Sequence, residues 1–180
     1  GAHLAALEAA GVQVRPSALV DEALRLLSPK LRLAQIEVAT EVRSHSEFLC
    51  ERREAQQILI NILNNAIEAM HGGGNLRIRI ANSIEWHRRL QPGIRITIAD
   101  TGSGMSPDVI RRIAEPFFTT REGVGTGLGM WVVHELIKKQ AGTISISSST
   151  APSHHGTVIS LFIPFTVAPV HPTSALATDR

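Results

Sequence analysis

Apolar side chains recur at the spacing of an α-helix in three stretches of the chain. The first stretch begins near Ser17, its expected cap, and Pro29 is expected to kink or restart that helix. The longest covers Glu51–Met70 and ends at the glycines that follow. The third covers Gly127–Gln140, and the Ala- and Leu-rich opening of the chain, residues 1–11, is expected to be helical as well.

Strand patterns lie between these helices. Residues Ile36–Val42 alternate apolar and polar side chains, which is the pattern of a strand with one buried face. Further strands are predicted over residues 12–14, 76–81, 94–99, 143–147 and 157–163. The polar segment 82–93 is expected to be a hairpin-type connection, and 148–156 a turn. This order of elements predicts an α+β fold, with one mixed sheet and helices packed on one of its faces.

One long loop interrupts this alternation. Residues 100–127 are rich in Gly, Pro, Ser and Thr, with one short helical piece near residues 107–114. Loops of more than about 15 residues inside a compact domain tend to be functional lids. We therefore divide the chain into the remnant of a linker or preceding helix (1–14), one domain (15–165) and a flexible tail rich in Pro, Ala and Thr (166–180).

Composition places the chain among globular proteins and excludes several functions. Of its 180 residues, 43% are hydrophobic and 19% are charged, which is enough apolar surface for a core. The 18 basic and 16 acidic residues leave a net charge of +2, too balanced to predict nucleic-acid binding. Cys50 is the one cysteine, so no internal disulfide can form. No segment resembles a signal peptide or has the roughly 20 apolar residues of a membrane helix, so we expect a cytoplasmic domain without direct membrane contact.

The longest predicted helix carries a polar stripe opposite its apolar face. Asn61, Asn64 and Asn65 lie in the middle of this helix, where each asparagine is unfavourable by roughly half a kcal/mol relative to alanine. One interpretation is an ordinary solvated face, but such a face normally uses Glu, Lys or Arg. The other interpretation is a site for a hard cation, because amide oxygens suit Mg²⁺.

Two glycine-rich segments and a pair of phenylalanines are further candidates. Residues 100–104, Asp-Thr-Gly-Ser-Gly, directly follow a predicted strand, and the alternative here is a simple turn. Residues 123–129 lead into a helix, where backbone N–H groups can hold phosphate, and the alternative is a flexible hinge. This segment fits neither the Walker nor the Rossmann pattern. Phe117 and Phe118 suggest a lid that packs against the body of the domain, or an ordinary loop anchor.

Taken in order and spacing, these segments resemble the four conserved boxes of the GHKL ATPase superfamily, specifically the catalytic ATP-binding domain of bacterial sensor histidine kinases. Residues 61–66 resemble the N box, 100–104 the G1 box, 116–121 the F box and 125–129 the G2 box. Gly156-Thr157 is similar to the closing Gly-Thr of the family, and the resemblance covers about residues 19–165. It implies a two-layer α/β sandwich of the Bergerat type, with a mixed sheet under three helices and a lid over about residues 101–127.

The resemblance also implies roles for individual residues. Asp100 would accept a hydrogen bond from the adenine amine, with Gly104 and Thr157 lining the base pocket. Asn65 would hold Mg²⁺ through its amide oxygen, with Asn61 helping through the water shell of the metal. The other residues assigned to ATP are Gly102, Met105, Gly125, Thr126, Gly127, Leu128 and Gly129, the last five around the triphosphate.

Two more assignments concern the lid and the catalytic step. Arg121 would pair with the γ-phosphate, and Phe117 and Phe118 would anchor the lid. Family members that hydrolyse ATP carry a glutamate at the position of Asn61, and an amide cannot act as that base. The pattern therefore favours phosphoryl transfer, with Asn61 and Arg121 as the catalytic residues. Glu68, one turn further along, could be a stray base or a solvated residue.

The expected function is the binding of Mg·ATP and transfer of its γ-phosphoryl group to a histidine on a separate dimerisation helix, which this sequence lacks. His134-Glu135 imitates the acceptor pattern but has no proline after it. The expected partners are the histidine-bearing domain and a response regulator, and the isolated domain is expected to be a monomer. Alternatives are a non-catalytic nucleotide-binding or docking module and an anti-sigma-type serine kinase, although the latter usually keeps an acidic residue at the position of Asn61.

Overall fold

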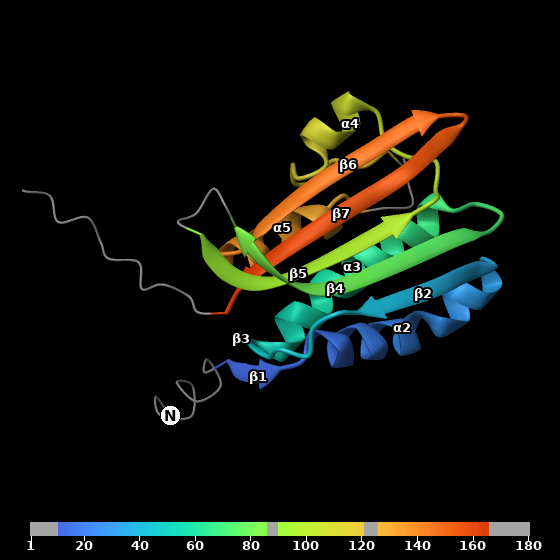
Figure 1. Ribbon diagram of the computed structural model, residues 1–180. Helices are drawn as coiled ribbons and strands as arrows, with labels where there is room; N and C mark the ends of the chain where they lie inside the picture. Colours follow the sequence, from blue (N-terminus) through green and yellow to red (C-terminus); the bar gives the residue numbers. More distant parts are fainter. Residues whose placement is uncertain (1–10, 86–89, 121–125, 166–180) are drawn as a thin grey trace, which may run out of the picture.

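The computed structural model describes residues 11–85, 90–120 and 126–165. It has two layers, a five-stranded sheet and a layer of helices on one of its faces (Figure 1). In chain order the elements are β1 (Val12–Val14), α2 (Pro16–Leu33), β2 (Ile36–Val42), β3 (Phe48–Cys50), α3 (Arg52–Ala69), β4 (Gly74–Glu85), β5 (Gln91–Asp100), α4 (Pro107–Arg112), α5 (Gly129–Lys139), β6 (Thr143–Ala151) and β7 (His154–Pro164).

The sheet is mixed, with the strand order β2-β4-β5-β7-β6. Strand β2 pairs with β4 in parallel, and the other neighbours are antiparallel. The register places Ile78 opposite Ile98, and Ile98 opposite Ile159. All three side chains are buried, because every second residue of these strands faces the helices. The predicted α+β class and mixed sheet are confirmed.

Helix α3 is the middle helix of the second layer, packed between α2 and α5 (Figure 1). Its N-terminus is capped by Glu51, whose carboxylate accepts hydrogen bonds from the backbone N–H groups of Arg53 and Glu54. Apolar residues recur along the helix and are buried against the sheet and its neighbours, namely Ala55, Ile58, Leu59, Ile62, Leu63, Ala66 and Ile67. The polar stripe of α3 therefore faces away from this core.

The first predicted helix differs from the structure in two details. Ser17 is not its cap, because the helix begins at Pro16 after Arg15, and proline is favoured in the first turn. Pro29 does not restart the helix, since α2 continues through it to Leu33. Pro29 is exposed, as is Arg25 one turn earlier, so water can reach the backbone carbonyl that proline leaves without a partner.

The structure also corrects several strand boundaries. Strands β4 and β5 extend into the segment that was expected to be a hairpin connection, up to Glu85 and from Gln91. Likewise β6 and β7 take in most of the predicted turn 148–156. Backbone pairing continues in these segments although their sequence no longer alternates between apolar and polar residues. A short pair of strands, β1 with β3, includes one strand that the sequence pattern did not predict.

Two expectations fall on residues outside the described part of the chain, the opening helix and the C-terminal tail. The division into three segments accordingly stays a prediction. Within the described residues, none of the helices combines the length and the apolar character needed to cross a membrane.

A matched pair of substitutions measures how much the core contributes. Leu63 is 1% exposed and Leu33 is 89% exposed, and both lie in helices. We expect Leu63→Ala to lower the free energy of unfolding by about 2–5 kcal/mol, because it leaves a cavity. Leu33→Ala should change it by no more than about 0.5 kcal/mol. Urea unfolding followed by circular dichroism measures both, and equal losses would contradict this description of the core.

Candidate functional site

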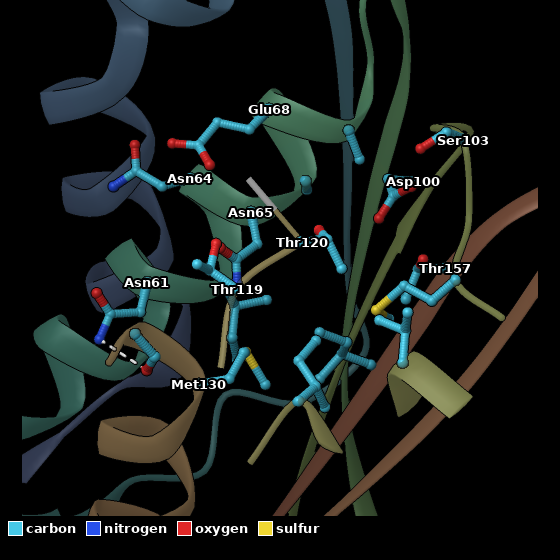
Figure 2. A pocket seen from close by; sticks show the side chains of 18 of the residues that line it. Asn61, Asn64, Asn65, Glu68, Asp100, Ser103, Thr119, Thr120, Met130 and Thr157 are labelled. Carbon is cyan, nitrogen blue, oxygen red and sulfur yellow. Dashed lines mark hydrogen bonds between the residues drawn. The ribbon is translucent and has the colours of Figure 1, made fainter. Parts of the chain in front are cut away.

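A cavity of about 430 Å³ opens between the polar face of α3, the segment around α4, the start of α5 and the adjoining strands β5 and β7 (Figure 2). Its wall contains most of the residues predicted from the sequence: Asn61, Asn65, Asp100, Gly104, Met105, Phe118, Thr126, Gly127, Gly129 and Thr157. These residues come from parts of the chain that are far apart in sequence. The fold therefore brings the four predicted boxes to one place.

Five predicted residues are not part of this described wall: Gly102, Phe117, Arg121, Gly125 and Leu128. Arg121 and Gly125 lie outside the described residues. Gly102 lies behind the wall, where an added Cβ would come within 2.7 Å of the Ala69 Cβ. Leu128 precedes the first residue of α5 without lining the cavity.

Asp100 ends strand β5 on one side of the cavity (Figure 2). Its Oδ1 accepts a hydrogen bond of 2.8 Å from the Gly102 N–H. Burial raises the pKa of the Asp100 carboxyl, and the backbone N–H groups of Gly102 and Thr157 oppose that shift. The site thus holds a desolvated, oriented acceptor, which suits an N–H donor such as an exocyclic amine.

Ser148 joins three residues near Asp100 by hydrogen bonds, and it was not predicted from the sequence. Its hydroxyl donates to the Gly156 carbonyl at 2.9 Å and accepts from the Met105 N–H at 2.8 Å. The Thr157 hydroxyl lies 2.8 Å away. Because a serine hydroxyl has one proton, Thr157 is the donor in that contact. Ser148 stands in a run of similar residues within a segment predicted to be a turn, so no signal in the sequence singled it out.

Two glycines are required by their conformation and their surroundings. Gly104 has φ +72°, and an added Cβ would collide with the Ser149 carbonyl oxygen. Gly127 has φ +65°, and an added Cβ would lie 2.5 Å from the Phe117 carbonyl carbon. Both are left-handed conformations that other residues rarely adopt. Close backbone packing beside the cavity therefore explains one glycine of the G1 box, Gly104, and one of the G2 box, Gly127.

The three asparagines of α3 all line the cavity. The Asn61 side-chain amide donates a 3.2 Å hydrogen bond to the Gly129 carbonyl and so connects α3 to the start of α5. Asn64 accepts a 3.0 Å hydrogen bond from the Lys30 ammonium group of α2. Asn65 lies between them and faces the cavity (Figure 2). The stripe is not simply a solvated face, and its contacts explain why it uses asparagine.

This donor set fits Mg²⁺. The Asn61 hydrogen bond uses the amide nitrogen, while Asn65 presents an amide to the cavity, so oxygen atoms are available to a cation. A hard cation that keeps several waters needs few protein ligands. Within residues 11–85, 90–120 and 126–165, no group of three or more His, Cys, Asp or Glu side chains could hold a metal ion by itself. A metal here would depend on amide oxygens and on the phosphates of a ligand.

The two phenylalanines of the lid segment differ. Phe118 lines the cavity, and the Arg112 guanidinium lies 4.3 Å from the centre of its ring. Phe117 is 75% exposed and has φ +66°. Its exposure shows that it does not anchor the lid in this structure, because it lacks the packing that an anchor requires. Only Phe118 occupies an anchoring position.

Comparison with known proteins gives the class of this site. Residues 50–167 match the family described as histidine kinase-, DNA gyrase B- and HSP90-like ATPases. The match covers well over half of the chain, and the protein belongs to this family. The resemblance inferred from the four boxes is confirmed, and the domain is of the type that forms the ATP-binding catalytic part of histidine kinases.

The individual relatives are sensor kinases. The chain is 32% identical to Sporulation kinase E of Bacillus subtilis over 81% of its own length and 19% of that protein. It therefore spans about a fifth of this relative. Among solved structures, the catalytic domain of histidine kinase ThkA is 24% identical with a TM-score of 0.72, over 86% of this chain and 95% of that one. This likeness confirms the fold.

Two further structures carry a ligand or a partner. Full-length ShkA in complex with AMPPNP is 27% identical with a TM-score of 0.71, over 88% of this chain and 32% of that one. ThkA has also been solved in complex with the response regulator protein TrrA, with 22% identity and a TM-score of 0.65, over 87% of this chain and 42% of that one.

The close packing at Gly104 can be tested by comparison with Gly72, a glycine in open surroundings. Gly72 also has a positive φ, but an added Cβ there meets nothing within 4 Å. Gly72→Ala should cost about 1–2 kcal/mol from backbone strain alone. We expect Gly104→Ala to cost clearly more, since the backbone at Ser149 must also move. Thermal unfolding measures both, and equal costs would contradict the close packing described here.

The partly buried carboxyl of Asp100 predicts a dependence of stability on pH. Because burial raises its pKa in the folded protein, stability falls as the pH rises from the ordinary aspartate pKa through the raised one. In Asp100→Asn the amide keeps an acceptor for Gly102 but has no charge to desolvate. We expect the variant to be more stable than the wild type at neutral pH, and the difference to vanish at a pH below the ordinary aspartate pKa. Urea unfolding at several pH values measures this, and a variant less stable than wild type at neutral pH would contradict it.

Proposed function

We propose that this domain binds Mg·ATP in the cavity and transfers the γ-phosphoryl group to a histidine on a separate dimerisation domain. The observation that carries the proposal is the arrangement of one cavity, with the partly buried Asp100 acceptor on one side and the asparagines of α3 on the other (Figure 2). The family of ATPases and the sensor kinases among its relatives support it.

Each side of the cavity suits one part of the nucleotide. Asp100 and Thr157 would hold the adenine base, with the carboxylate accepting from the exocyclic amine. Asn65 and Asn61 would hold Mg²⁺, which supplies charge neutralisation and orientation of the phosphates when bound. The N–H groups at the start of α5, around Gly127 and Gly129, would contact phosphate oxygens. The roles of Arg121 and Gly125 stay predictions.

The amide at position 61 bears on the type of reaction. An amide at Asn61 cannot take a proton from water, which disfavours hydrolysis. In the transfer, a neutral imidazole nitrogen of the acceptor histidine forms a bond to the γ-phosphorus, the bond from that phosphorus to the bridging oxygen of ADP breaks, and ADP leaves. Positioning and charge stabilisation supply most of the catalysis in such reactions.

The partners follow from the same proposal. The acceptor would be the histidine-bearing dimerisation domain of a longer kinase, and the phosphoryl group would pass from it to a response regulator. The structures of ShkA with AMPPNP and of ThkA with TrrA support these ligand and partner classes. Because ATP is the donor, we expect the domain to work in the cytoplasm, and we expect the isolated domain to be a monomer.

A labelling experiment tests the transfer. The domain is mixed with the dimerisation domain, Mg²⁺ and ATP labelled at the γ-phosphate. We expect acid-labile label on the dimerisation domain, and a reaction slower by about 10- to 100-fold with Asn65→Ala, because the bound Mg²⁺ would lose a protein ligand. Asn75→Ala is the matched control, since Asn75 lies on β4, outside the described cavity wall.

The other results of this experiment identify the alternatives. Acid-stable label would indicate a serine or threonine kinase. Nucleotide binding without any label would indicate a docking module. An equal loss of rate in Asn65→Ala and Asn75→Ala would contradict the assigned metal site.

A further inference from the structure

We propose that Lys30 is a phosphate-binding residue of the nucleotide cavity and that Asn64 positions it. The inference rests on the proposed function, because ATP supplies the anionic partner. Lys30 lies near the end of α2, whereas the four boxes all follow α2 in the sequence. It also precedes residues 50–167, the part that matches the ATPase family.

The geometry joins Lys30 to the metal-binding face of α3. Its ammonium group donates a 3.0 Å hydrogen bond to Asn64 Oδ1, and both residues line the cavity. Asn64 is adjacent to Asn65, the residue proposed to hold Mg²⁺. Asn64 lies across the cavity from Asp100 (Figure 2). Its partner Lys30 is therefore held on the side where the phosphates of a nucleotide would lie.

The partner of Lys30 leaves its charge available. Asn64 is neutral, so the hydrogen bond fixes the ammonium group without cancelling its charge, and an ammonium group has two further N–H donors. A carboxylate at this position would instead form an ion pair and compete with phosphate. A neutral acceptor such as Asn64 can therefore orient the lysine and leave its charge for an anionic ligand.

Charge in the cavity gives the second argument. Among the described residues that line it, the ionisable side chains are Lys30, Glu68 and Asp100, so Lys30 is the only cation of that set. The triphosphate of ATP carries several negative charges, and binding of the adenine at Asp100 would place its end on the opposite side of the cavity. A lysine on that side attracts the terminal phosphate. We therefore assign Lys30 to the terminal phosphate.

Calorimetric titration with ADP and with AMPPNP, both with Mg²⁺, tests the assignment. A hydrogen bond between charged groups corresponds to roughly 10- to 100-fold in affinity. We expect Lys30→Met to weaken AMPPNP binding by about 10-fold or more, and ADP binding much less. Lys30→Arg should restore most of the affinity for AMPPNP, because it keeps the charge.

Two further variants separate positioning from general effects. Asn64→Ala should weaken AMPPNP binding less than Lys30→Met does, and adding it to Lys30→Met should cause little further loss. Arg32→Met removes another exposed cation from α2 that does not line the described cavity, and it should leave both affinities unchanged. Thermal unfolding of every variant confirms that the domain is folded.

The outcomes are distinct. A folded Lys30→Met variant that binds AMPPNP as tightly as the wild type would overturn the inference. So would equal losses for ADP and AMPPNP, which would indicate a structural role for Lys30. Failure of the wild type to bind either nucleotide would instead overturn the proposed function on which the inference rests.

Discussion

Helix α3 is packed on three sides, and both the core and the cavity depend on this packing. Two helices flank it and the sheet lies beneath it, so only a narrow polar strip is left for the cavity. Its apolar residues at helical spacing hold the core together, and the asparagines between them face the cavity. One face of α3 thus contributes to the core and the other to the site, so the helix fixes the position of the site relative to the core.

The asparagine contacts show how this strip is used. Asn61 connects α3 to the start of α5, and Asn64 connects it to Lys30 of α2. Asn65, between them, faces the cavity. Both neighbouring helices are therefore joined to the strip through side-chain amides, which act as donor and as acceptor. This arrangement would position the groups proposed to bind metal and phosphate before a nucleotide enters.

Much of the fold and of the site could be predicted from the sequence, for physical reasons. The period of α3 is clear because its apolar face is buried along its whole length, and Asp100 ends a strand whose inner residues alternate between more and less buried positions. The extra lengths of strands β4 to β7 could not be predicted, because there the backbone ladder alone continues the strand. The same reasoning explains the missed site residues. Ser148 bonds to residues of the cavity wall and Lys30 lines the cavity, and only the packing of neighbouring elements gives them these positions.

Titration calorimetry of the whole chain with ADP and AMPPNP, with and without Mg²⁺, tests the central claim most directly, because it measures the nucleotide site itself. For the wild type we predict a single site, with tighter binding of AMPPNP when Mg²⁺ is present, and severely weakened binding of both nucleotides in Asp100→Ala. A folded wild-type protein that binds neither nucleotide would contradict the account. Equal affinities in the wild type and Asp100→Ala would contradict the assignment of the adenine to Asp100.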